Sequence, residues 1–165
     1  MPTKTGHKYL ICDAANPSWG KTTTLTEVIN IFKTLSSAFN MIDRKLYKNK
    51  AGQIIDEWIV FQEVATSKTI LIQTQGDEKQ SFNYTNEYLE TGSIVDIIIC
   101  ASHLNGPSWN AVERIVKRYG YTQINFSNFC PLNSRNRKKL FQIPAISDVN
   151  KVHLAQLIYN FVLAL

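Results

Sequence analysis

The spacing of apolar positions changes along the chain between the period of a helix and that of a strand. From Lys21 to Thr34, apolar side chains recur at positions i, i+3, i+4 and i+7, which is one face of a helix; they are Leu25, Val28, Ile29 and Phe32. Short β-rich or alternating runs separate the helical stretches and predict strands. The predicted strands cover residues 8–14, 39–42, 57–64, 68–73, 94–101 and 121–126.

Helical spacing returns in three further stretches, residues 82–91, 110–119 and 149–165. The connection Ala65-Thr66-Ser67 is short, so the strands on either side of it should form an antiparallel hairpin. The order of elements predicts an α/β domain of three layers, in which a mostly parallel sheet of five or six strands carries helices on both faces. No linker rich in Gly, Pro or Ser divides the chain, so residues 1–165 should form a single domain.

Composition narrows the class of protein. The chain has 165 residues, 44% hydrophobic and 19% charged, which is a globular composition. Its net charge of +5 suits phosphate-bearing ligands without indicating nucleic acid. The apolar run from Tyr9 to Cys12 is too short for a signal peptide, and no segment approaches the ~20 apolar residues of a membrane span. We therefore expect a cytoplasmic protein without a membrane partner, and the scattered Cys and His residues form no metal-ligand cluster.

In a sheet of this kind, ligands bind beyond the carboxyl ends of the parallel strands. The first loop at that edge reads Ala15-Asn16-Pro17-Ser18-Trp19-Gly20-Lys21-Thr22. Its last three residues match the end of the pattern G-x-x-x-x-G-K-[ST]. In that pattern backbone N–H groups surround phosphates, the Lys contacts the terminal phosphates and the hydroxyl ligates Mg²⁺. Ala15 replaces the first glycine, and Trp19 either shields the phosphates or packs inside.

The strand, loop and helix from Lys8 to Phe32 resemble the phosphate-binding region of the P-loop containing nucleoside triphosphate hydrolase superfamily, with a modified loop. The resemblance implies a nucleoside triphosphate ligand, ATP or a related nucleotide, together with Mg²⁺. It also implies that the residues from Ala15 to Thr23 contact the phosphates, that Lys21 is catalytic and that Thr22 ligates the metal.

The second loop, Gln73-Thr74-Gln75-Gly76-Asp77-Glu78, follows the predicted hairpin. It resembles the D-x-x-G switch region of small GTPases, in which the Asp holds the Mg²⁺ shell and the Gly N–H contacts the γ-phosphate. Here Gln73 stands at the Asp position and supplies no charge, whereas Gly76 remains. Asp77 either orients a water or a substrate hydroxyl, which would be a catalytic role, or is a turn residue. Asp13, near the end of the first predicted strand, either approaches magnesium or braces the neighbouring chain.

The third loop covers residues 102–109 and follows the most apolar predicted strand. It lacks the N/T-K-x-D pattern that reads guanine, which argues against GTP. His103 either belongs to the site or lies on the surface, and Ser108 either meets a ligand or caps the following helix. The tripeptide Pro-Ser-Trp occurs in both the first and third loops, so Trp19 and Trp109 would line one pocket if the match is not chance.

Two functions remain open. The first is an NTPase or a small kinase-like phosphotransferase with a small-molecule or protein acceptor. The second is a catalytically weak nucleotide-binding switch or scaffold, which the neutral Gln73 favours over an efficient hydrolase. A cation for a phosphoryl-transfer transition state has several sources, between which the sequence does not choose: Arg44, Arg114, Arg118, Arg135 and Arg137.

Overall fold

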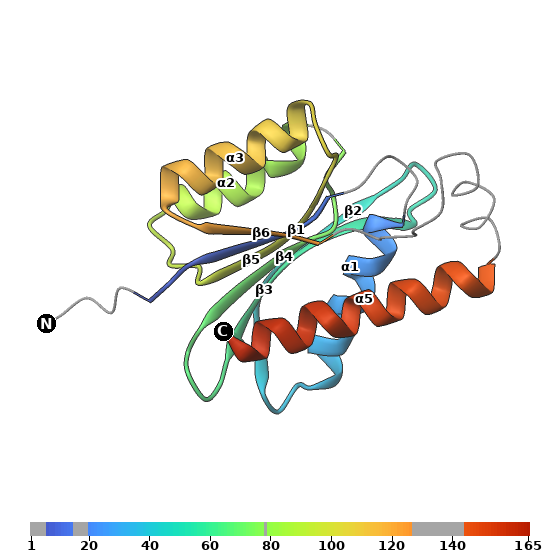
Figure 1. Ribbon diagram of the computed structural model, residues 1–165, viewed down its shortest axis with the longest axis horizontal. Coiled ribbons are helices and arrows are strands. Elements are labelled where there is room, and N and C mark those ends of the chain that lie inside the picture. The colour runs from blue at the N-terminus through green and yellow to red at the C-terminus, as the bar shows by residue number, and fades with distance from the viewer. Residues whose placement is uncertain (1–5, 15–19, 78, 127–143) are drawn as a thin grey trace, which may run out of the picture.

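The computed structural model describes residues 6–14, 20–77, 79–126 and 144–165. A six-stranded sheet lies at its centre, with helices packed on both faces (Figure 1). The strands are β1 (Tyr9–Ala14), β2 (Phe39–Lys48), β3 (Ile54–Glu63), β4 (Thr69–Gln73), β5 (Ile97–Ser102) and β6 (Thr122–Phe126). The helices are α1 (Lys21–Thr34), the short 3-10 helix η1 (Lys79–Phe82), α2 (Asn83–Glu90), α3 (Pro107–Tyr119) and α5 (Pro144–Ala164).

Two separate apolar cores lie on the two faces of the sheet. Helices α1 and α5 cover one face, and α2 and α3 cover the other (Figure 1). Successive strand residues point to opposite faces, so Ile11 of β1 packs with α1 whereas Leu10 and Cys12 pack on the α2–α3 side. The apolar stripe predicted for the first helix is fully buried in the α1–α5 core, as expected for an amphipathic helix.

The predicted α/β class with helices on both faces is confirmed. The sheet is mixed: β4, β5, β1 and β6 run parallel, whereas the β2–β3 and β3–β4 pairings are antiparallel, which includes the predicted hairpin. The first helix has the predicted bounds, but β2 extends six residues beyond the predicted end to Lys48. That extension is an exposed edge strand, so no buried face marks it in the sequence.

The strand order, β2-β3-β4-β5-β1-β6, decides which loops meet. β5 lies between β4 and β1, with Cys100 opposite Cys12 on one side and opposite Gln73 on the other. The carboxyl ends of these three parallel strands therefore reach the same edge of the sheet. The loops that follow them carry the residues singled out from the sequence. Within the described residues, no helix is long and apolar enough to cross a membrane.

Candidate functional site

The N-terminus of helix α1 lies at this edge of the sheet, with Gly20 as its N-cap residue. Gly20 adopts a left-handed conformation, with φ 78°, and its carbonyl accepts the first helical hydrogen bond from the Thr24 N–H at 2.8 Å. A residue with a Cβ would be strained at that φ. Among the described residues no side chain caps the helix, and its first turn contains no acidic residue. The partial positive charge of the helix is therefore not offset by a capping carboxylate.

Four ionisable side chains gather beside this N-terminus; Asp13, Lys21, Asp77 and His103 are called the Lys21 cluster below. Lys21 is buried, with 5% of its side chain exposed, and its Nζ lies 3.8 Å from Asp77 Oδ1. Nε2 of His103 lies 3.4 Å from the same oxygen. Burial lowers the pKa of Lys21, an effect that the neighbouring carboxylates Asp77 and Asp13 oppose. The loops after β4 and β5 thus meet at α1.

Asp13 is the most unusual member of the Lys21 cluster. Its side chain is fully buried at the end of β1, and neither carboxyl oxygen has a hydrogen-bond partner in the part of the chain that the structure describes. Burial raises the pKa of Asp13 from 3.8 to about 6, although the positive charge of Lys21 acts in the opposite direction. An unsatisfied buried carboxyl costs stability, and such costs concentrate at functional sites.

A second acid, not singled out from the sequence, lies beside Thr22. Asp56 of β3 is close enough to Thr22 for its hydroxyl to lower the pKa of the Asp56 carboxyl. Oδ1 of Asp56 accepts the Thr74 hydroxyl at 2.9 Å. Thr74 is itself buried, and its Oγ1 accepts the backbone N–H of Glu57 at 2.8 Å, which fixes the end of β4 against β3. Burial raises the pKa of Asp56, and the nearby Asp77 adds to this effect, whereas the two threonine hydroxyls lower it.

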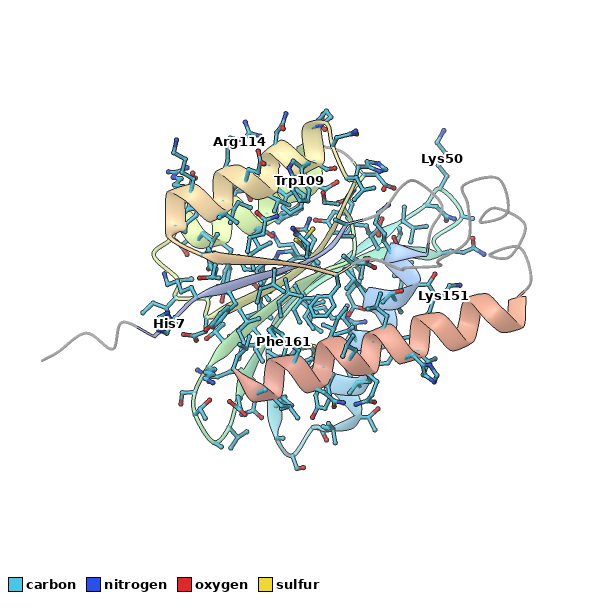
Figure 2. The ribbon with its side chains drawn as sticks, viewed as in Figure 1. His7, Lys50, Trp109, Arg114, Lys151 and Phe161 are labelled. Atoms are coloured by element: carbon cyan, nitrogen blue, oxygen red, sulfur yellow. The ribbon has the colours of Figure 1, made fainter. Side chains whose placement is uncertain are left out.

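A second lysine also reaches the start of α1 from a distant part of the chain. The Lys151 side chain of α5 crosses Gly20 closely, because a Cβ built on Gly20 would lie 2.9 Å from Lys151 Cε. Figure 2 shows Lys151 on α5 below α1. No sequence pattern singles out Lys151, since it is one polar position in a long helix. Its proximity arises only from the packing of α5 on α1.

Position 76 requires glycine because the backbone there packs directly against Ala101 of β5. A Cβ at this position would lie 2.0 Å from the backbone oxygen of Ala101, so only glycine lets the loop after β4 approach β5 this closely. The contact brings Asp77 next to the loop that carries His103. A contact between the Gly76 N–H and a phosphate stays a prediction.

The expectation that position 73 faces a magnesium shell is wrong. The Gln73 side chain is 1% exposed and lies on the α2–α3 side of the sheet, opposite α1. Its Oε1 accepts the Thr85 hydroxyl at 2.6 Å, and its Nε2 donates to the Gln75 carbonyl at 2.6 Å. The Trp58 indole donates to the same Thr85 hydroxyl at 3.0 Å. Trp58, Gln73 and Thr85 form a neutral, fully bonded group, called the Gln73 network below. The physical reason is the alternation of side chains along β4: Gln73, like Leu71, points to the α2–α3 face, away from α1.

Of the other candidates from the sequence, Ser108 and Trp109 form hydrogen bonds within the protein, Thr23 is exposed, and several lie outside the described residues. Thr23 is exposed on α1. Ser108 does not cap α3; it is buried within that helix, and its Oγ accepts the His103 N–H at 3.2 Å. The Trp109 indole donates to Glu113 at 2.8 Å on the outer side of α3. Residues Ala15, Asn16, Pro17, Ser18 and Trp19, like Arg135 and Arg137, lie outside the described residues.

Arg44, one of the five arginine candidates, is engaged elsewhere. Its Nε lies 2.6 Å from Glu57 Oε1, and the same oxygen accepts Lys33 Nζ at 2.8 Å.

The described residues contain no group of three or more His, Cys, Asp or Glu side chains arranged to hold a metal ion by themselves. No protein-family model matches the chain, and neither a curated protein nor a solved structure matches it.

Proposed function

We propose that this chain binds a nucleoside triphosphate with Mg²⁺ at the N-terminus of α1. The observation that carries the proposal is the buried Lys21 beside a helix start without a capping side chain. A buried ammonium and oriented backbone N–H groups are the two components of a phosphate site at a strand-to-helix junction. The loop from Ala15 to Trp19 supplies the remaining N–H groups in this proposal.

The metal belongs beside Thr22 in the same proposal. Thr22 would be one ligand, with Asp56 next to it as the acid that position 73 does not provide. The half-buried Asp56 carboxyl fits this role because burial opposes its ionisation, and a bound cation would offset that cost. Bound Mg²⁺ neutralises charge on the phosphates.

Asp77 and His103 give the site its capacity for phosphoryl transfer. Asp77 is 73% exposed and touches both Lys21 and His103, so it stands at the open side of the cluster, where an acceptor would enter. A carboxylate there orients a water for an NTPase, or a hydroxyl of a small molecule or protein for a kinase-like enzyme. We favour ATP over GTP because the loop after β5 lacks a guanine-reading motif.

The second candidate function is a nucleotide-binding switch or scaffold with little turnover. One observation favours it: Asp77 lies 3.8 Å from Lys21, where it competes with a phosphate for the lysine charge. A nucleotide would have to displace Asp77, and this displacement would move the loop that packs on β5 through Gly76. Slow turnover with a large nucleotide-dependent change in this loop would identify the second function.

Calorimetry with ATP, GTP and their diphosphates, with and without Mg²⁺, tests the proposal. Lys21→Ala should lower triphosphate affinity by roughly tenfold to a hundredfold or more, because a charge-assisted contact contributes ~1.5–3 kcal/mol. Lys117→Ala, which removes an exposed lysine of α3, is the matched control and should bind like wild type. Equal affinity of Lys21→Ala and wild type, with both variants folded by circular dichroism, would exclude a phosphate site at α1.

A further inference from the structure

A groove runs between α2 and α3, on the face of the sheet opposite α1. It has a volume of about 650 Å³ and is lined by Asn83, Asn86, Glu90, Ala111, Arg114, Lys117 and Arg118. The α2 residues are spaced i, i+3 and i+7, and the α3 residues i, i+3, i+6 and i+7. Each set is therefore one stripe of its helix, and the two stripes face each other.

The walls of the groove rest on a packed core. Thr85 and Leu89 of α2 are buried toward the sheet, as are Val112 and Ile115 of α3. Ala111 forms a small, 3% exposed floor between the walls. A groove set between packed helices is preformed, so a partner does not have to order it on binding.

The charges of the groove are unequal. Three cations, Arg114, Lys117 and Arg118, face one carboxylate, Glu90. Glu90 is already paired with Arg118 across the groove at 2.8 Å. Neither Arg114 nor Lys117 makes an ion pair with any other described residue, and both are exposed. Figure 2 shows Arg114 on the outer side of α3, directed away from the sheet.

We propose that this groove docks an acidic helical segment of a partner protein. Arg114 and Lys117 are one helical turn apart, so they match carboxylates placed three or four residues apart on a partner helix. The eight residues of α2 give a wall about 12 Å long, enough for roughly two turns of such a helix. The small Ala111 floor leaves room for the partner side chains, and the two asparagines on the α2 wall supply donors and acceptors for its polar groups.

The composition of the groove favours an acidic protein segment over nucleic acid. The Glu90–Arg118 pair leaves Arg114 and Lys117 as the cations of the groove without an ion-pair partner among the described residues. Three cations on a single stripe neutralise few phosphates, whereas strong non-specific binding needs many. Electrostatic complementarity of this limited kind orients a partner and selects it more than it adds affinity.

The test uses the full chain and an alanine-based helical peptide labelled with fluorescein, carrying glutamates one turn apart. Fluorescence anisotropy at low salt should show binding, and the same peptide with glutamine in place of glutamate should not bind. The double variant R114E/K117E leaves the Glu90–Arg118 pair in place and should weaken binding by roughly tenfold or more. Glu90→Gln removes the competing carboxylate and should tighten binding.

The matched control is K48E/K50E, which changes net charge by the same amount on the exposed β2–β3 hairpin, far from Arg114 (Figure 2). Equal weakening by the two double variants would mean that only overall charge attracts the peptide, and would overturn the proposal. Absence of peptide binding by the folded wild type would also overturn it. A labelled oligothymidine that binds more tightly than the peptide, and that R114E/K117E releases, would assign the groove to nucleic acid instead.

Discussion

Two buried polar groups lie on opposite faces of the sheet and are built in opposite ways. The Gln73 network, on the α2–α3 side, contains no charge, and each of its side-chain donors has an acceptor. The Lys21 cluster, on the α1 side, contains a buried ammonium that pairs with Asp77. It also contains the buried carboxyl of Asp13, which has no hydrogen-bond partner among the described residues. A satisfied neutral network fixes a structure, whereas unsatisfied charge that a protein retains is typical of a binding or catalytic site.

The difference also explains why position 73 does not supply a carboxylate beside Thr22. Gln73 is a structural residue because its side chain points to the α2–α3 face and is held there by the Thr85 hydroxyl and the Gln75 carbonyl. Asp56 of β3 lies near Thr22 instead, and the Thr74 hydroxyl at the end of β4 donates to the same carboxyl. The comparison therefore predicts that changes to the Gln73 network lower stability, and that changes to the Lys21 cluster and its neighbours alter ligand binding and the pH dependence of stability.

The largest expected effect is on stability, from Gln73→Asp. A carboxylate would lose the bond to the Gln75 carbonyl and place a charge in a neutral buried site, lowering the free energy of unfolding by about 3 kcal/mol or more. Urea denaturation measures this, with Gln73→Leu as an uncharged control that should lose less. A Gln73→Asp protein that stays as stable as wild type and gains magnesium-dependent ATP binding would reverse the assignment of the two faces.

The next effect is the pH dependence of stability through Asp13. Its pKa is raised from 3.8 to about 6 on folding. Between these values the folded state keeps a proton that the unfolded state has lost, so stability falls as pH rises through this window and levels off above it. The fall attributable to Asp13 amounts to ~3 kcal/mol. Asp13→Asn should remove this slope and be more stable than wild type near pH 7. Parallel stability–pH curves for the two proteins would show that Asp13 finds a partner.

A smaller effect is expected on the magnesium-dependent part of ATP affinity. Asp56→Asn and Thr22→Ala should each reduce it by about tenfold, because each removes one group from the proposed metal site. In EDTA both variants should bind ATP like wild type. Asp43→Asn, on the exposed part of β2, is the control. Loss of affinity that is equal with and without Mg²⁺ would assign Thr22 and Asp56 to the start of α1 rather than to a metal.

The smallest effect is expected from Lys151. Lys151→Met keeps the methylenes that cross Gly20 and removes the charge, so ATP affinity should fall by about threefold at low salt. Lys151→Arg should restore it, and added salt should erase the difference between the variants. If Lys151→Met binds as wild type does at low salt, Lys151 serves only to pack α5 against α1.

The sequence predicts local features of this structure, such as helix α1, but not the contacts between residues far apart in the chain. Helix α1 was predicted with its observed bounds because periodicity is a local property, and Lys21 followed from its position at a strand-to-helix junction. Asp56 and Lys151 gave no such signal, since one is an ordinary strand position and the other an ordinary helix position. Their place beside α1 depends on strand order and helix packing, which local spacing does not determine. Gln73 was misplaced because side chains alternate along β4, and local spacing does not show which face of that strand carries α1.

The strand order also determines which strand pairs can form early in folding and which form late. β2, β3 and β4 follow one another in the chain and pair with sequence neighbours, so this meander closes only short loops. β1 has no partner until β5 and β6 are available, since Tyr9 pairs with Ile97 and Thr122. During synthesis the apolar strand that carries Asp13 therefore emerges well before β5 and β6, and until then it is an exposed segment open to chaperones or to association with other chains. Contacts of such long sequence separation slow folding, and the candidate site becomes complete only in its last steps.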